Sequence, residues 1–137
     1  MNRQGIIDRL VVELKTISDV GQNVYSEMKT WDDVPDDQFP TLIVQAYTET
    51  PTYAGAEMDT DFRVMIYGYV MSQDHRESQL NTLINNVRDK IHADFSTNGL
   101  TYDRKITSIV TDAGWLKPVG YMVMEISCSV HDVITTR

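Results

Sequence analysis

The stretch DFRVMIYGYVM (residues 61–71) decides the fold together with the segment that follows it, SQDHRESQLNTLINNVRDKIHADF (residues 72–95). The first stretch is rich in Val, Ile, Phe and Tyr, which favour a pleated and partly buried strand. After the polar break at residues 72–74 the apolar period changes from two to about 3.6 residues, which predicts an amphipathic helix over residues 74–94. The apolar face of that helix holds Leu80, Leu83, Ile84, Val87 and Ile91.

Similar patterns place the other elements around this strand and helix. Apolar residues at helical spacing predict a first helix over residues 3–18, and a weak alternation predicts an edge strand over residues 23–30. The remaining strands are expected at residues 41–48, 61–71, 105–111 and 121–130. Consecutive strands with short connections favour an antiparallel pairing. The expected fold class is therefore α+β, a two-layer, mainly antiparallel β-sheet with two α-helices packed on one face.

Length and composition narrow the possible classes of protein. The chain has 137 residues, a formal net charge of −8, 42% apolar residues and one cysteine. We expect a single domain over residues 1–137, with no intramolecular disulfide and no apolar run near the roughly 18–20 residues that span a bilayer. The first residues form no signal segment, which indicates a cytoplasmic protein. The acidic balance opposes non-specific binding of nucleic acid, because such binding uses a basic patch.

The sheet face away from the helices carries large side chains. If Phe62, Val64, Ile66 and Val70 meet the helices, the alternate residues of the same strand point the other way. Methionine and tyrosine are enriched at protein interfaces, so this face is a candidate subunit or partner interface. Its residues are Met65, Tyr67, Tyr69, Met71, Tyr121 and Val123. The alternative is that residues 49–60 or residues 23–30 fold back over the same face.

Two polar segments are candidate arms that reach neighbouring molecules. Residues 49–60 carry Pro51 and Gly55 and join two strands as a long hairpin arm. Segments of this length within a small domain are more often functional than idle. The second arm is residues 113–119. The arm residues that we expect to make contacts are Glu49, Tyr53, Glu57, Asp59, Trp115 and Lys117.

The sequence shows no constellation typical of a catalytic or metal site. The three histidines lie far apart without ligand spacing, and Cys128 lies on the apolar face of a strand. The acidic cluster in residues 32–37 is the best candidate for a cation site, but it lacks the glycine and distal glutamate of a calcium loop. The alternative for these aspartates is a solvated loop in which they cap turns. We therefore expect no enzyme activity, no metal and no cofactor.

The order of these features resembles a known family. VYSEMKTWDDVP (residues 24–35) follows the first helix, and QFP (38–40) opens the next strand. YGYV (67–70), the second helix, TDAG (111–114) and PVG (118–120) come later. This arrangement resembles the tail terminator proteins of long-tailed bacteriophages, also called tail completion or neck proteins.

The resemblance implies a structural role. Such proteins form a ring, usually a homo-hexamer, on the last ring of the tail tube, where they stop tube polymerisation and provide the joint to the head connector. The implied partners are other copies of the chain, the tail tube protein and a head–tail connector or stopper protein. DNA would pass through the lumen without specific binding, and the protein would be found in the virion tail. Two alternatives stay open: a connector or stopper protein, and a small metal-dependent nuclease that uses Asp32, Asp33, Asp36 or Asp37.

Overall fold

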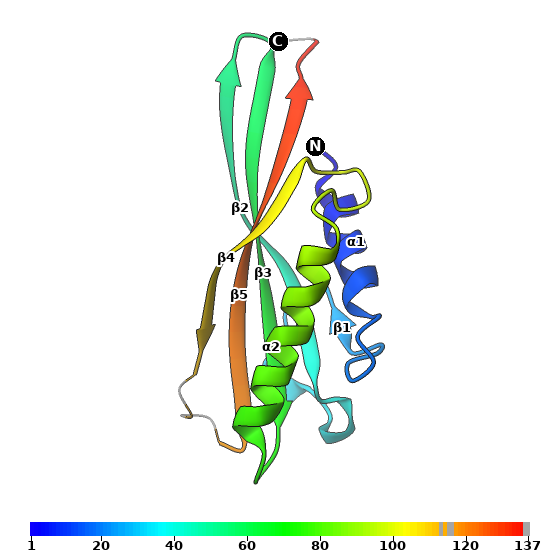
Figure 1. Cartoon of the computed structure of the whole chain (residues 1–137), viewed down its shortest axis with the longest axis vertical. Helices are drawn as coiled ribbons and strands as arrows, with labels where there is room; N and C mark the ends of the chain where they lie inside the picture. The colour runs from blue at the N-terminus through cyan, green and yellow to red at the C-terminus, as the bar shows by residue number, and fades with distance from the viewer. Residues whose placement is uncertain (113, 115–116, 136–137) are drawn as a thin grey trace.

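The computed structural model describes residues 1–112, 114 and 117–135 and folds them into α-helices packed on one sheet (Figure 1). The N-terminal part contains α1 (Arg3–Leu14), β1 (Val24–Tyr25) and two 3₁₀ helices at Trp31–Asp33 and Asp36–Gln38. The remaining elements are β2 (Thr41–Ala54), β3 (Glu57–Met71), α2 (Arg76–Ala93), β4 (Asp103–Thr111) and β5 (Val119–Val133).

The sheet has the strand order β1-β2-β3-β5-β4. The β2–β3, β3–β5 and β4–β5 pairs are antiparallel, and only the short β1 runs parallel to its neighbour β2. Both α-helices lie on the same side of the sheet, whose strands twist past one another in Figure 1. The structure thus confirms the expected α+β class with a mainly antiparallel sheet.

The core fills the space between the helices and the sheet. The predicted apolar face of α2 is buried, and so are the helix-facing residues Phe62, Val64, Ile66 and Val70 of β3. Gly68 lies between them, and a Cβ atom on it would fall 3.0 Å from Cδ2 of Leu83 and 2.8 Å from Cε of Met122. The absence of a side chain at this position therefore lets α2 pack closely on the middle of the sheet.

The first helix is shorter than predicted. It ends at Leu14, whereas the apolar pattern continues to Ile17. The amide of Ile17 donates to the carbonyl of Leu14 over 3.1 Å, so the chain tightens into turns after the helix. Ile17 and Val20 remain buried. The apolar pattern predicted the burial of Ile17 correctly, although it did not distinguish helix from turn.

The strand predicted at residues 23–30 is wrong apart from Val24 and Tyr25, which pair with Leu42 and Ile43. Beyond Tyr25, side chains form hydrogen bonds with backbone groups that a longer strand would pair. The amide of Gln45 donates to the carbonyl of Ser26, and the backbone N–H of Thr30 donates to Asp33 over 3.3 Å. Bonds between side chains and the backbone take the place of ladder bonds here, and the one between Thr30 and Asp33 is local.

β2 and β3 are longer than predicted, because the segment between them is strand. Their pairing continues to Ala54 and Glu57, and only Gly55 and Ala56 form the turn. Gly55 has φ +63°, a conformation that glycine adopts at no steric cost in the first position of a tight hairpin turn. The predicted arm is thus a β-hairpin. β5 joins it as a third strand, paired as far as Glu57 with Val133.

Two buried arginines bind near the ends of α2, and the sequence patterns predicted a structural role for neither of them. Arg104, on β4, donates to Glu13 of α1 over 2.8 Å and to the carbonyls of Ile91 and Lys90 over 3.2 and 3.1 Å. At the other end of the helix, the Nε of Arg76 donates to the carbonyl of Val119 over 2.8 Å. The last carbonyls of a helix have no partner within it, so Arg104 satisfies groups that burial would otherwise leave unpaired.

Candidate assembly surface

The sheet face away from the helices holds the six predicted interface residues at one end. Tyr67 and Tyr69 pair with Val123 and Tyr121 across β3 and β5, which places all four on this face. The rings stack, with centroids 6.4 Å apart for Tyr67 and Tyr121 and 5.2 Å apart for Tyr69 and Tyr121. We call the six predicted residues the aromatic face: Met65, Tyr67, Tyr69, Met71, Tyr121 and Val123.

Residues 25–39 cover part of the aromatic face. Tyr25 and Phe39 pack on it beside the buried Ile43 and Val119. The hydroxyl of Tyr69 donates to the carbonyl of Lys29 over 3.3 Å, and only 6% of Tyr69 is exposed. Burial raises the pKa of Tyr69 to about 12. One end of the face is therefore closed by the chain itself, which is the alternative that the sequence analysis left open for residues 23–30.

The rest of the aromatic face is half-buried. Met65, Tyr67, Met71, Tyr121 and Val123 keep part of their surface in solvent. Val110 of β4 pairs with Val123 and extends the same face, with 60% of its surface exposed. The local pattern of residues 105–111 does not identify Val110 as a surface residue, because the register of β4 on β5 shifts between Ile106 and Ser108.

Charged side chains replace the apolar ones farther along the same face. Arg63 donates to Asp61 over 2.9 Å and to Glu125 over 3.4 Å, and Ser127 donates to Asp61 over 2.5 Å. The hydrogen bond to Asp61 raises the pKa of the Arg63 guanidinium above its ordinary value. Asp61 is thus engaged in an ion pair. The face changes from aromatic to charged along the strands.

The β2–β3 hairpin and the end of β5 project beyond the helices as an arm (Figure 1). We define the arm as residues 47–54, 57–60 and 130–133. Glu49, Tyr53, Glu57 and Asp59, four of the residues expected to make contacts, are exposed on it. At its base Glu49 accepts a hydrogen bond from Arg3 over 2.8 Å, and the Arg3 guanidinium lies 5.6 Å from the centre of the Phe62 ring. The start of α1 therefore fixes the arm to the body.

The second predicted arm falls largely outside the described residues. Trp115 lies outside them, as do residues 113 and 116. Lys117 is exposed in the turn before β5.

His131 and Asp59 face each other across β5 and β3 on the arm, with Nδ1 and Oδ1 2.7 Å apart. The hydrogen bond to Asp59 raises the pKa of His131, and the charges of Asp59, Glu57 and Asp132 act in the same direction. A group whose pKa is raised in the folded state stabilises that state below its unfolded pKa of about 6.5 and loses this contribution as the pH rises through the folded value.

We expect Asp59→Asn to lower the pKa of His131, because it removes the negative charge and leaves only a neutral amide oxygen as the acceptor of that hydrogen bond. A proton NMR titration of the imidazole measures the shift directly. Asp89→Asn, an exposed change on α2, serves as the matched control and should leave the His131 titration where it is. An unchanged His131 pKa in Asp59→Asn would show that the pair does not form in solution.

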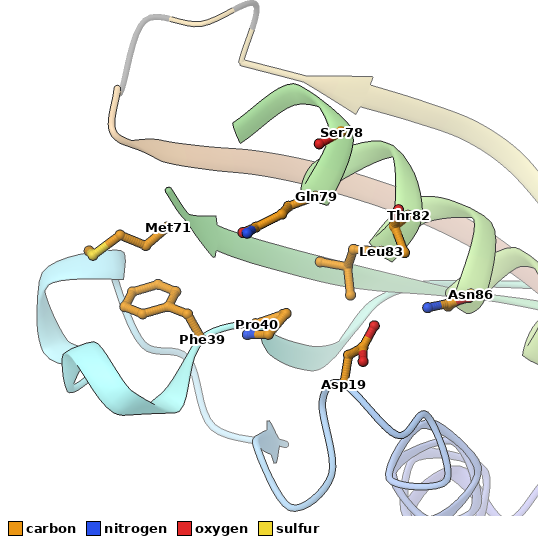
Figure 2. A pocket seen from close by; sticks show the side chains of 9 residues that line it. All are labelled: Asp19, Phe39, Pro40, Met71, Ser78, Gln79, Thr82, Leu83 and Asn86. Carbon is orange, nitrogen blue, oxygen red and sulfur yellow. The ribbon is translucent and has the colours of Figure 1, made fainter. Parts of the chain in front are cut away.

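A shallow groove lies between α2 and the turn that enters β2 (Figure 2). Its volume is about 410 Å³. Phe39, Met71 and Leu83 give it an apolar floor, and amides, hydroxyls and one carboxylate surround them. The other lining residues are Asp19, Pro40, Ser78, Gln79, Thr82 and Asn86. These groups can hold a polypeptide segment by hydrogen bonds, but their arrangement contains no nucleophile with an adjacent base.

The candidates for metal chemistry do not come together. Within residues 1–112, 114 and 117–135, no group of three or more His, Cys, Asp or Glu side chains could hold a metal ion. The four aspartates of the acidic cluster belong to the two 3₁₀ helices, where Asp33 accepts from the hydroxyl of Thr30 over 2.9 Å. Burial raises the pKa of the Cys128 thiol to about 12.

None of the helices in the described part of the chain is long and apolar enough to cross a membrane.

Comparison with protein families gives one finding that bears on this surface. A family model described as Bacteriophage Tail Tube Terminator Protein matches residues 6–135. The match includes both helices almost completely, all five strands and the whole arm. A comparison with curated proteins finds no match.

Proposed function

Because this chain belongs to the bacteriophage tail tube terminator family, we propose that it forms a ring that caps the tail tube and stops its polymerisation. The family match confirms the resemblance that the sequence suggested and makes the chain a phage tail protein. We further propose that the ring is a homo-hexamer and that it provides the joint to a head connector or stopper protein. In this role the protein acts by shape and contact, without an enzymatic step.

The exposed part of the aromatic face supports self-association. Fully burying one large apolar side chain contributes roughly 1.5–3 kcal/mol. Met65, Tyr67, Tyr121, Val123 and Val110 each offer the part of such a contribution that belongs to their exposed surface, and together these parts oppose the entropic cost of association. This surface and the projecting arm are the two features through which copies of the chain can contact one another or the tube protein.

The charge of the chain is compatible with DNA passing through the ring. A net charge of −8 opposes the counterion release that drives non-specific binding to DNA. A ring built from such subunits would let the genome slide past without holding it. In this proposal the chain binds the tail tube protein and the connector, whereas DNA passes through the ring without being bound.

The first experiment measures the solution mass by light scattering over a range of concentrations, with electron microscopy of the same fraction. We expect ring particles with about six times the 15.7 kDa of one chain. A monomer in solution calls for the same measurement after addition of tail tubes from the same phage. Capping of tube ends supports the terminator function, and binding to isolated connectors without binding to tubes would instead identify a stopper. Binding to neither would overturn the proposal.

A pair of tyrosine variants tests the aromatic face. Tyr67→Ser removes a half-exposed ring and should weaken assembly while leaving the free energy of unfolding nearly unchanged. Tyr69→Ser is the matched control, because Tyr69 is buried under residues 25–39 and its loss should lower stability instead. If Tyr67→Ser lowers stability and leaves the oligomeric mass intact, the aromatic face belongs to the core and is not an interface.

A further inference from the structure

Within the described residues, no strand lies beside residues 47–52 on one edge of the arm or beside residues 130–133 on the other. On one side, β1 pairs only with Leu42 and Ile43 of β2, so residues 47–52 of β2 have no strand beyond them in the part of the chain that the structure describes. On the other side, the pairing of β4 with β5 ends at Ser129, so in the described part of the chain no strand lies beyond residues 130–133 of β5, where the terminal ammonium of Met1 donates to the Asp132 carboxylate over 3.1 Å. An edge strand with unpaired backbone groups is a template for pairing with another chain.

The two edges suit a head-to-tail contact. β2 and β5 are both antiparallel to β3, so they run in the same direction on opposite sides of the arm. A second copy placed alongside the first, without inversion, brings the β5 edge of one copy against the β2 edge of the next as a parallel pair. Each such contact leaves one free edge of each kind, so it can repeat around an axis until the ring closes. Closure removes the edges altogether.

The charges on the arm favour this contact over its alternatives. Residues 50–56, TPTYAGA, are uncharged in a chain of net charge −8, whereas Glu57, Asp59 and Asp132 lie on β3 and β5. Within residues 47–52 of β2 the one acidic residue is Glu49, which accepts a hydrogen bond from Arg3 over 2.8 Å, so pairing β5 with this edge sets at most one partnered carboxylate beside Asp132. Pairing two β5 edges would bring Asp132 of both copies together, and like charges directly opposite each other destabilise a sheet.

The β2 edge is suited to a short ladder. Pro51 has no N–H to donate, and the register with β3 shifts between Ala46 and Thr48. Proline and bulges on an edge strand limit uncontrolled pairing. A short ladder is stable only where the geometry of a closed ring holds the edges together, which suits a protein that must form a ring and not an open fibre.

We propose that neighbouring copies in the ring are joined through their arms, with residues 130–133 of β5 pairing in parallel with residues 47–52 of β2 in the next copy. This inference rests on the proposed function, since it requires a ring. It adds the identity of the two surfaces that meet and the direction in which they run.

Mixing single-cysteine variants tests the contact. One protein carries Val133→Cys, and its partner carries Thr48→Cys, Thr50→Cys or Thr52→Cys, positions within residues 47–52 that share a sheet face with Val133 and cover three registers. Paired strands bring Cα atoms within the roughly 4.4–6.8 Å that a disulfide needs. We expect one of the three mixtures to form disulfide-linked dimers under oxidation in the ring. The native Cys128 is buried and does not compete.

Two controls define the outcomes of this test. Asn81→Cys, on the exposed surface of α2, should not link to Val133→Cys. Rings that form without any link between the two edges would overturn the pairing and leave the terminator function standing. Links only between two β2 cysteines would show two-fold pairing of β2 edges and would also overturn it. If no ring forms in solution or on tail tubes, the proposed function and this inference fail together.

A lysine on the edge provides an independent readout. Thr52→Lys places a charge where the neighbouring strand would lie, and we expect it to abolish ring formation without changing the thermal stability of the single chain. Asn81→Lys adds the same charge on α2 and should leave the rings intact. If Thr52→Lys forms rings that are as stable as those of the unchanged chain, the proposed edge pairing is wrong.

Discussion

Replacing Arg104 with methionine should lower the free energy of unfolding by about 3–5 kcal/mol, the effect expected when one partner of a buried ion pair is removed. None of the Arg104 side chain is exposed, and 11% of the Glu13 side chain is. The change leaves the Glu13 carboxylate and the last carbonyls of α2 buried without a donor. Chemical denaturation at equal protein concentration measures the loss.

The reason for so large an effect is that Arg104 joins three elements. Its guanidinium connects β4 to α1 through Glu13 and to the C-terminal end of α2 through the carbonyls of Lys90 and Ile91. It also donates to the buried hydroxyl of Thr97 over 3.3 Å. No other residue type offers five donors in a planar fork, so lysine should not replace it.

Two variants make this prediction specific. Lys105→Met removes a positive charge from the exposed neighbouring position and should change stability by less than about 0.5 kcal/mol. The double variant Arg104→Met with Glu13→Leu removes the stranded carboxylate as well and should recover part of the loss. If Arg104→Met is no more destabilising than Lys105→Met, the network does not hold the helices on the sheet.

Replacing Phe62 with alanine should lower the free energy of unfolding by about 3–5 kcal/mol. Phe62 is fully buried at the point where the arm leaves the body, between β2 and β5 and under Arg3. Its loss opens a cavity and removes the ring over which the Arg3 guanidinium lies. We expect hydrogen exchange to increase most in residues 47–54 and 57–60, because the start of α1 no longer packs on the base of the arm.

Phe95→Ala provides the matched control for this change. Phe95 lies just after α2 with 62% of its surface exposed, so the same substitution there should cost no more than about 0.5 kcal/mol. A uniform rise in hydrogen exchange over the whole chain in Phe62→Ala would show that the arm and the body unfold as one cooperative unit. Equal losses in the two variants would contradict the burial of Phe62.

Local patterns predicted the sidedness of the elements well. The spacing of Leu80, Leu83, Ile84, Val87 and Ile91 identified the buried face of α2, and all five are buried. The alternation in β3 separated Phe62, Val64, Ile66 and Val70 from the aromatic face correctly. These predictions succeed because the period of a strand or helix is set by the backbone and needs no knowledge of distant partners.

The length of β2 and β3 could not be predicted in the same way. Residues 49–60 are polar and lack an apolar face, so they resemble a loop when only burial is considered. They form strands because β3 pairs with β2 on one side and with β5 on the other up to the tip. Backbone hydrogen bonds with a strand more than 60 residues away supply the order that side-chain burial does not.

The sequence by itself determined the two amphipathic helices, the strands that face them and the family that the chain resembles. Each of these depends on the residues within one element or on their order along the chain. Only the tertiary structure decided that residues 25–39 close one end of the aromatic face, that Arg104 holds α1, α2 and β4 together, and that residues 47–52 and 130–133 have no strand beyond them within the described residues. Each of those depends on groups far apart in sequence meeting in space, and a local pattern carries no record of which partner a side chain or a strand edge will find.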